Sequence, residues 1–281
     1  MATRARQVRV TFLSDNCVAA MGVYAEHGLS LHVEVDDRAY LFDTGASGVC
    51  VENAVRLELD LGAIDAIIIS HGHEDHTGGL KAVLAEHGAR EIIAHPKTFT
   101  GKYGRPRGGR ARSIGCPTSR AALSRLGATF RLRAEPQELA PCLLTSGEIA
   151  RTTDFEKIPP AFVVKQGGAF VRDPFDDEQA LLVRTRRGLV VIVGCAHRGI
   201  INTLRHAVRL TGESRIAAVI GGSHLGPASP RQVARTIEEL QALDVRRVVA
   251  CHCTGFGAAA ELRAALGDRF HPGGVGASFT F

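Results

Sequence analysis

The sequence predicts an α/β protein built as a sandwich of two mixed β-sheets with helices on the outside. Two β-hairpins are indicated, because short runs with strand character flank tight turns at 36–38 and 185–188. Elsewhere, strand-like apolar runs alternate with segments of helical spacing, as in parallel strands joined by helices. The run 189–193 is apolar without alternation, so this strand is expected to be buried on both faces. Hairpins combined with strand–helix alternation indicate mixed sheets.

The first part of the chain places a polar run, residues 70–79, between a buried strand and a helix. Helices over 53–60 and 74–87 are predicted from their spacing, and Gly88 is a typical residue just past a helix end. Short apolar runs on both sides of the second helix predict buried strands, which makes a strand–loop–helix unit. The strands predicted in this part are 8–13, 31–35, 39–42, 66–69 and 91–94.

The second part of the chain continues the same mixture. Ser229 and Pro230 suit the N-cap and the first position of a helix. A length of 281 residues allows one large domain or two small ones, and we expect a single domain over 1–281 with two αβ halves, roughly 1–125 and 126–281. The strands predicted here are 129–133, 143–145, 162–165, 180–184, 189–193, 216–220 and 247–251, with helices over 200–210 and 230–243.

Composition indicates an ordinary water-soluble globular chain. The chain is 45% hydrophobic, and its longest apolar runs fall far short of the roughly 20 residues that span a membrane. The basic N-terminus is followed by too few apolar residues for a secretory signal. Seven scattered cysteines argue against a disulfide framework and for a reducing, cytoplasmic environment. The sequence is silent on oligomeric state.

The net charge of +5 is concentrated in one glycine-rich stretch, 97–112, which contains no acidic residue. One interpretation is a solvated mobile loop. The other is a flexible lid whose cations bind phosphate or carboxylate groups of a small anionic substrate. Nucleic acid is disfavoured because Phe99 and Tyr103 are the stretch's only stacking surfaces and the chain lacks tryptophan. The candidate substrate-binding residues are Lys102, Arg105, Arg107, Arg110 and Arg112.

The polar run 70–79 is the strongest functional motif. Three imidazoles and two carboxylates fall between His71 and His76, directly after a buried strand. Imidazole nitrogen and carboxylate oxygen suit zinc and related divalent ions. His71 and His73 leave the same face of an extended segment, and Asp75 and His76 follow where a helix begins. Solvated histidines in a polar turn are the ordinary alternative, but this spacing predicts a metal site with room for two ions.

Other polar side chains follow apolar strands in the second part of the chain. Cys195 and His197 follow 190–193, and His252 follows 248–250. His224 follows another strand through a pair of glycines. A single histidine after a strand is usually a hydrogen-bonded core residue, but several such clusters indicate that strand ends gather ligands at one edge.

These motifs together resemble the metallo-β-lactamase superfamily. The resemblance rests on Ser70–Gly79, on Leu41–Gly45, and on the later segments Val193–His197 and Ala250–His252. It implies the αβ/βα four-layer sandwich of that fold. Three further segments, Ser14–Asn16, Thr145–Ile149 and Gly221–Leu225, resemble the branch labelled 7,8-dihydropterin-6-yl-methyl-4-(β-D-ribofuranosyl)aminobenzene-5′-phosphate synthase, a pterin-related activity.

The resemblance also implies roles for individual residues. His71 and His73 would bind one metal, while Asp75, His76 and His252 would bind another, and Asp43 would buttress the metal loop. One or two divalent ions are expected, zinc foremost, with iron or manganese as alternatives.

Three positions depart from the family pattern. Glu148 stands where the family has a histidine between the halves, although a surface glutamate is an equal interpretation. Cys195 stands where an aspartate normally bridges the two metals, and His197 is positioned to replace the missing histidine. The sequence leaves open which of the three completes the site.

Hydrolysis is the chemistry expected first, because a bound metal lowers the pKa of water toward about 7. Asp75 would orient that water or take its proton, and His224 is the candidate general acid. A pterin-linked condensation, in which an aromatic amine replaces water, is a specific variant. Two alternatives lie outside this class: redox or oxygen chemistry at a di-iron site, and a metal-stabilised binding module without turnover.

Overall fold

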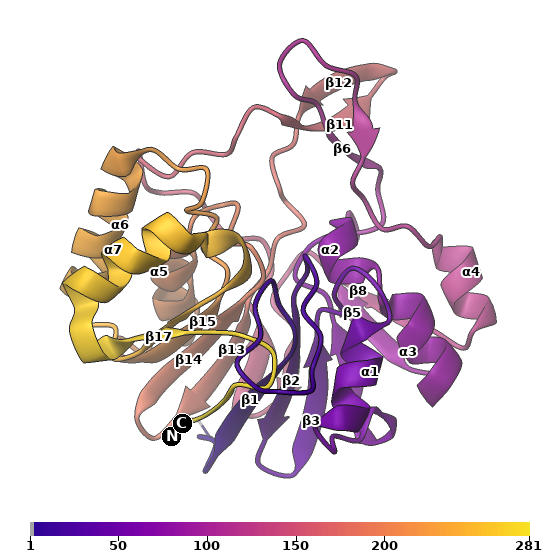
Figure 1. The fold of residues 1–281 in the computed structure, drawn as a ribbon, viewed down its shortest axis with the longest axis horizontal. Helices are drawn as coiled ribbons and strands as arrows, with labels where there is room; N and C mark the ends of the chain where they lie inside the picture. The colour runs from indigo at the N-terminus through magenta and orange to yellow at the C-terminus, as the bar shows by residue number, and fades with distance from the viewer. Residues whose placement is uncertain (1–2) are drawn as a thin grey trace.

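Two seven-stranded sheets face each other across the centre of the molecule (Figure 1). The computed structural model describes residues 3–281. Each sheet is antiparallel at one side and parallel at the other, which confirms the predicted mixed sheets. In spatial order the first sheet is β18 (Ser278–Thr280), β1 (Val8–Ser14), β2 (Ser30–Val35), β3 (Arg38–Phe42), β4 (Ala66–Ile68), β5 (Glu91–Ala94) and β8 (Thr129–Leu132). The second is β17 (Phe270–Pro272), β16 (Val248–Ala250), β15 (Ile216–Gly221), β14 (Gly188–Val193), β13 (Leu181–Thr185), β10 (Leu143–Thr145) and β9 (Glu138–Ala140).

Helices cover the outer face of each sheet, which gives the four-layer αβ/βα sandwich (Figure 1). One apolar cluster fills the space between the sheets, and two others lie between a sheet and its helices. Strand β14 is buried along its whole length, as its unbroken apolar run predicts. No helix among the described residues has the length and apolar character that crossing a membrane requires. The helices are α1 (Val49–Arg56), α2 (Glu74–Thr77), α3 (Leu80–His87), α4 (Arg120–Arg125), α5 (Ile200–Thr211), α6 (Pro230–Ala242) and α7 (Phe256–Leu266).

The predicted single helix over 74–87 is wrong, because the chain forms two helices that break at Gly78 and Gly79. A Cβ atom on Gly78 would lie 2.0 Å from the carbonyl oxygen of Ala46, and one on Gly79 would lie 2.1 Å from that of Thr44. The amide of Gly78 also donates to the carbonyl of Gly45. This close backbone approach, which only glycine permits, ends α2 after one turn. The helix predicted over 53–60 is shifted as well, since α1 runs from Val49 to Arg56.

The basic stretch 97–112 is not a continuous loop. Part of it enters a third, four-stranded sheet that stands above the sandwich (Figure 1), in the order β12 (Ala169–Arg172), β11 (Phe162–Gln166), β6 (Lys102–Gly104) and β7 (Arg112–Ser113). Tyr103 packs edge-on against Phe170, and the ammonium of Lys165 lies over both rings. Strands β6 and β7, the two that lie in this stretch, are too short to give a periodic signal, which explains why the sequence indicated a loop there.

The first sheet takes strands from both ends of the chain. Strand β8 pairs with β5 although it begins after residue 125, and β18 pairs with β1. The two sheets therefore do not coincide with the expected halves 1–125 and 126–281. The carboxyl ends of β4, β14 and β16 carry the polar motifs, so the site is assembled along one edge of the sandwich.

Candidate metal centre

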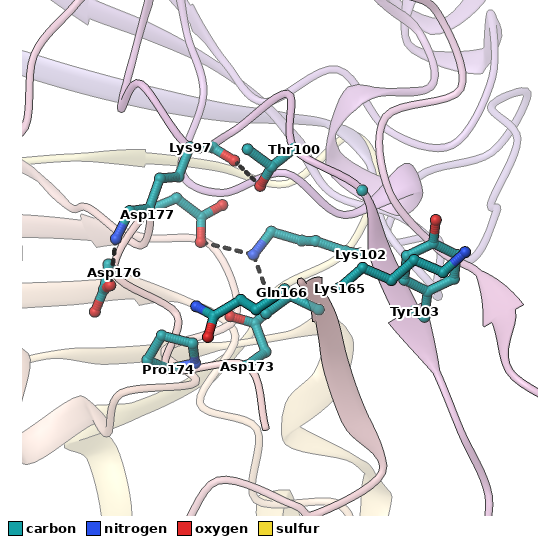
Figure 2. Close-up of a pocket in the computed structure, with 12 residues that line it drawn as sticks. Lys97, Thr100, Lys102, Tyr103, Lys165, Gln166, Asp173, Pro174, Asp176 and Asp177 are labelled. Atoms are coloured by element: carbon teal, nitrogen blue, oxygen red, sulfur yellow. Dashed lines mark hydrogen bonds and ion pairs between the residues drawn. The ribbon is translucent and has the colours of Figure 1, made fainter. Parts of the chain in front are cut away.

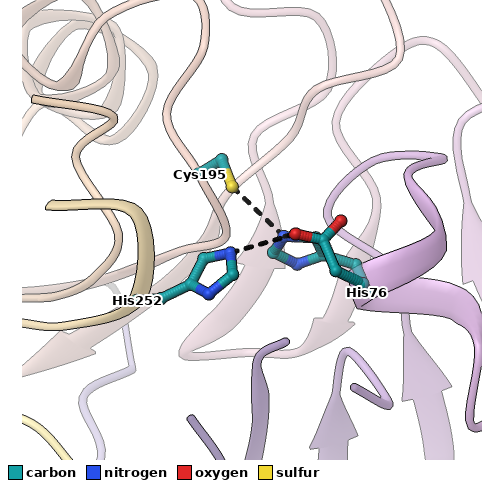
Figure 3. A group of neighbouring side chains, drawn as sticks. His76, Cys195 and His252 are labelled. Carbon is teal, nitrogen blue, oxygen red and sulfur yellow. Dashed lines mark hydrogen bonds and ion pairs between the residues drawn. The ribbon is translucent and has the colours of Figure 1, made fainter. Parts of the chain in front are cut away.

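The polar run 70–79 forms a loop after β4 and then enters α2. Most of the ligand candidates in this run are buried. His71, His73 and His76 are buried, and Asp75 is partly exposed. The opposite side of the centre comes from the second sheet. Cys195 and His197 follow β14, and His252 opens a 3₁₀ turn after β16. Figure 3 shows Cys195, His76 and His252 pointing toward one another from separate elements.

The ligand atoms form two groups that share one residue. In the first group, atoms of Asp75, His76, Cys195 and His252 all lie within 4.8 Å of one another. In the second, the same holds for His71, Cys195 and His197. The ring of His73 lies beside the second group, with its centroid 4.6 Å from that of His71 and 4.9 Å from that of His197. Cys195 therefore sits where two adjacent ions would meet.

Several imidazole nitrogens in the centre are buried and have no hydrogen-bond partner among residues 3–281. They are Nε2 of His71, His73 and His252, and both ring nitrogens of His197. A buried polar atom without a partner costs free energy, so this concentration of orphaned atoms calls for a ligand. Nitrogen, thiol and carboxylate donors at this spacing match zinc and similar first-row ions. The residues present thus fit the metals that the sequence motif predicts.

The electrostatics keep three histidines in the neutral form that binds metals. Burial, aided by neighbouring imidazoles and by Lys102, holds the pKa values of His71 and His197 well below their usual range. Burial likewise lowers the pKa of His73 to about 3. His76 differs: burial lowers its pKa, but Asp75 and Asp43 outweigh that effect and raise it to about 9. The same attraction to His76 and His252 outweighs burial at Asp75 and lowers the pKa of its carboxyl group.

Asp43 supports the metal loop from behind. Its Oδ2 lies 2.7 Å from His76 Nδ1, and its Oδ1 accepts a 2.7 Å hydrogen bond from the backbone amide of Ser70. The hydroxyl of Ser70 donates to Asp43 Oδ2 and lies 2.9 Å from His71 Nδ1. One buried carboxylate therefore orients two imidazoles of the centre, and this is the place that the resemblance gave it.

Several residues at the centre carried no functional signal in the sequence. Asp15 Oδ1 accepts the backbone amide of His252, and Asn16 Oδ1 lies 2.8 Å from His252 Nδ1. His27 lies on the rim, with Nε2 3.5 Å from Asp75 Oδ2 and its ring 5.2 Å from that of His252. The segment 14–16 was noticed only for its resemblance to one branch, and His27 stands alone in the sequence. Their contacts depend on the fold.

A cleft of about 360 Å³ opens over the centre, and the small third sheet forms one of its walls. Its lining includes Phe162 from β11, Arg112 from β7 and Ile114. On the facing side, the His224 ring lies 4.4 Å from that of His197 and 5.6 Å from that of Phe162. Burial lowers the pKa of His224 to about 4, so the imidazole is uncharged at neutral pH. An uncharged imidazole can form hydrogen bonds in the cleft, and its role as a general acid stays a prediction.

The structure separates two predicted residues from the cleft. Glu148 lies in neither ligand group found among residues 3–281, and its Oε1 is 3.1 Å from His95 Nε2. Its side chain is 47% exposed, as expected for the surface alternative. Lys102 is buried, and its ammonium contacts Asp173 and Asp177 instead of facing the cleft.

Of the four arginines predicted to bind a substrate, one lines the cleft and three lie elsewhere. Arg112 lines the cleft and lies 3.3 Å from Glu74. Arg105 lies over the ring of Phe170, away from the centre, and Arg107 and Arg110 are exposed in the loop between β6 and β7.

Comparisons with known proteins agree with this geometry. The family model described as the metallo-beta-lactamase superfamily matches residues 24–252. The chain is 34% identical, over 83% of its length and 82% of the relative, to a 7,8-dihydropterin-6-methyl-4-(beta-D-ribofuranosyl)-aminobenzene-5'-phosphate synthase of Methanocaldococcus jannaschii. It is 30% identical to an uncharacterized protein of the same organism, over 90% of this chain and 93% of that one.

A solved structure extends the likeness to nearly the whole chain. Tm1679, described as a metal-dependent hydrolase of the beta-lactamase superfamily, superimposes with a TM-score of 0.83 at 31% identity, covering 97% of this chain and 98% of the other. The fold, the ligand motif and these comparisons together show that the chain belongs to the metallo-β-lactamase superfamily.

Proposed function

We propose that this protein is a metal-dependent enzyme that acts on a small phosphorylated substrate in the cleft over Cys195. The observation that carries the proposal is the pair of ligand groups that share Cys195, surrounded by buried imidazole nitrogens without partners. His71, His73 and His197 would hold one ion, and Asp75, His76 and His252 the other. Zinc suits the mixture of nitrogen, sulfur and oxygen donors, and iron or manganese would also be accepted. Such an ion supplies a Lewis acid and lowers the pKa of bound water.

The relative named as a synthase supports a condensation as the reaction. The product in that name joins the methyl carbon of a dihydropterin to an aromatic amine that carries a ribose phosphate. In such a step, the bond from the methylene carbon to its leaving group breaks, a carbon–nitrogen bond forms, and the amine loses a proton. Phe162 offers a flat apolar surface beside the centre, and Arg112 offers a guanidinium that suits a phosphate.

Hydrolysis is the second candidate, because the 31% identical Tm1679 is described as a metal-dependent hydrolase. Water would then replace the amine as the nucleophile in the same cleft. In both cases the partly exposed carboxylate of Asp75 would orient the nucleophile, and His224, which also lines the cleft, would form a hydrogen bond with the substrate.

The experiment compares the two reactions in one preparation. The purified, metal-loaded protein receives a dihydropterin with a leaving group on its 6-methyl carbon together with the aminobenzene ribofuranosyl phosphate, and mass spectrometry detects the coupled product. Parallel samples receive phosphodiester, lactone and thioester substrates. We expect turnover that a chelator abolishes and that H71A/H73A lacks. H95A is the matched control, since His95 is a buried histidine outside both ligand groups. No turnover in any sample, or turnover indifferent to chelator and to H71A/H73A, would refute the proposal.

A further inference from the structure

Lys102, on β6, is the centre of a buried charge cluster next to the metal loop. Its side chain is 2% exposed, and its ammonium lies 2.8 Å from Asp173 Oδ2 and 2.7 Å from Asp177 Oδ1. Figure 2 shows the ammonium between the two carboxylates, at a pocket of about 290 Å³ that is separate from the cleft. Both carboxylates are buried as well, so each requires its ionic partner.

The first contact from this cluster reaches the two histidines of the polar run. The second oxygen of Asp177 accepts a 2.8 Å hydrogen bond from the backbone amide of Gly72, the residue between His71 and His73. Gly72 packs closely against a neighbouring segment, because a Cβ atom there would lie 2.0 Å from the carbonyl oxygen of Thr98. The carboxylate that Lys102 holds therefore fixes the backbone from which both imidazoles project.

The second contact passes through an aromatic ring. The ammonium of Lys102 lies 4.9 Å from the centroid of the Phe175 ring. The same ring stacks on the imidazole of His197, with centroids 4.0 Å apart and planes at 22°. Cation–π attraction and stacking both hold a ring in a fixed plane. His197, the histidine predicted to replace the one that this chain lacks relative to the family pattern, is thus oriented from behind by Phe175.

We infer that Lys102 is a positioning residue for the metal group His71, His73 and His197, through Asp177 and Gly72 on one side and through Phe175 on the other. The inference rests on the proposed metal site. The three imidazoles come from two distant segments, and Lys102 is the point at which their supports meet. Residues that orient metal ligands typically change metal affinity 10- to 100-fold when they are removed. The group Asp75, His76 and His252 depends on Asp43, Asp15 and Asn16 instead, so its affinity is expected to be independent of Lys102.

The test is a metal titration of the apoprotein with Co²⁺ and with Zn²⁺, followed by absorbance and by competition with a chromogenic chelator. The wild-type protein should bind two ions, and H197A and H252A identify which step belongs to which group. The variant K102M/D173N removes the ammonium and one carboxylate together, which keeps the charge of the cluster and leaves Asp177 in place. We expect the affinity for the ion that H197A fails to bind to fall about tenfold or more. The affinity for the ion that H252A fails to bind should be unchanged. K97M is the matched control, since it breaks only the exposed pair with Asp176 in the same pocket.

A second variant, F175L, tests the contact through the ring and keeps the test decisive if K102M/D173N does not fold. It should weaken the same step while leaving the other ion bound. If folded K102M/D173N and F175L bind both ions as tightly as K97M does, the inference is overturned. Equal weakening of both steps would also overturn it, because that result indicates general loosening of the fold. A wild-type protein that binds no ion would contradict the proposed function itself, and with it this inference.

Discussion

Cys195 places a thiol where the two ligand groups overlap, and His76 Nε2 lies 3.2 Å from its sulfur. Burial holds the pKa of this thiol well above its usual range. Because the thiolate is the form that binds metal, uptake of an ion must release the proton, and affinity is expected to rise with pH. The family pattern has an aspartate at this position, whose carboxylate would need no such release near neutral pH.

Replacement of Cys195 by alanine is predicted to weaken binding of both ions, because its sulfur belongs to both groups. The metal content of the purified protein checks this, together with loss of the sulfur-to-cobalt absorption band in Co²⁺-substituted samples. C195D should restore metal binding without the band. C142A is the matched control, since Cys142 is a buried cysteine of the core between the sheets. A C195A protein that keeps two tightly bound ions would contradict the bridging position.

His32, on β2, supplies a prediction away from the centre. Burial lowers its pKa, and Glu34, 3.7 Å away, offsets that effect only in part. The unfolded chain therefore takes up a proton at His32 more readily than the folded chain does. The contribution of His32 to the free energy of unfolding is fully present above the unfolded pKa of about 6.5 and is lost as the pH drops below it. Unfolding in urea from pH 7.5 to 5 should show a shallower loss of stability in H32L than in the wild type. Parallel curves for the two proteins would refute this.

Among the elements, the short helix α2 shows how backbone contact sets the metal loop. Its one turn carries Asp75 and His76, and it ends because Gly78 and Gly79 lie against the backbone of residues 44–46. The same loop contains Asp43, which supports His76. A continuous helix over 74–87, as the spacing predicted, would not bring α2 against this loop. The spacing of apolar residues indicates only that the segment 74–87 favours a helix. The break between α2 and α3 depends on contacts with residues 44–46, about thirty positions earlier in the chain.

The substitution G79A should destabilise the fold by about 1–3 kcal/mol, because the added methyl group meets the carbonyl oxygens of Thr44 and Ser47. Metal affinity should fall with it, since α2 carries two ligands. The free energy of unfolding in urea and a metal titration measure the two effects. G257A, in the first turn of α7, is the control: nothing lies within 4 Å of its new Cβ, and alanine favours a helix. A G79A protein as stable as G257A would contradict the packing argument.

At the scale of the whole molecule, the metal centre joins the two sheets. His71, His73, Asp75 and His76 follow a strand of the first sheet, whereas Cys195, His197 and His252 follow strands of the second. An ion bound by residues of both sheets would link them at the open edge. It would also satisfy nitrogens that are buried without partners among residues 3–281.

Removal of metal is therefore predicted to lower the melting temperature of the whole chain. A ligand at 100 times its Kd stabilises the folded state by about 2.7 kcal/mol, and two ions contribute more. Calorimetry with and without a chelator, followed by addition of Zn²⁺, measures the loss and its recovery. H71A/H73A should respond less to either addition than H95A does. A melting temperature that is the same with metal and with chelator would show that the centre does not join the sheets.

The sequence predicted much of the fold and part of the metal centre. Features made by residues close together in the sequence were predicted, and contacts between residues far apart in the sequence were not. Strands such as β5 and β10 were predicted residue for residue, because each contains a pair of adjacent aliphatic residues that indicates burial. The run from His71 to His76 was equally evident, since its ligands are neighbours in sequence. The contacts of Asp177 with Gly72, and of Asp15 with His252, join residues more than one hundred positions apart. No local pattern contains them.

The order of these residues along the chain has a consequence for synthesis. His71 and His73 leave the ribosome well before Cys195 and His197, His252 follows later, and β18, which pairs with β1, comes after all of them. Until then the first sheet lacks an edge strand, and the centre lacks a ligand. A nascent chain therefore has no complete ligand group until Cys195 and His197 have been made, and the group with Asp75 and His76 would wait for His252 as well.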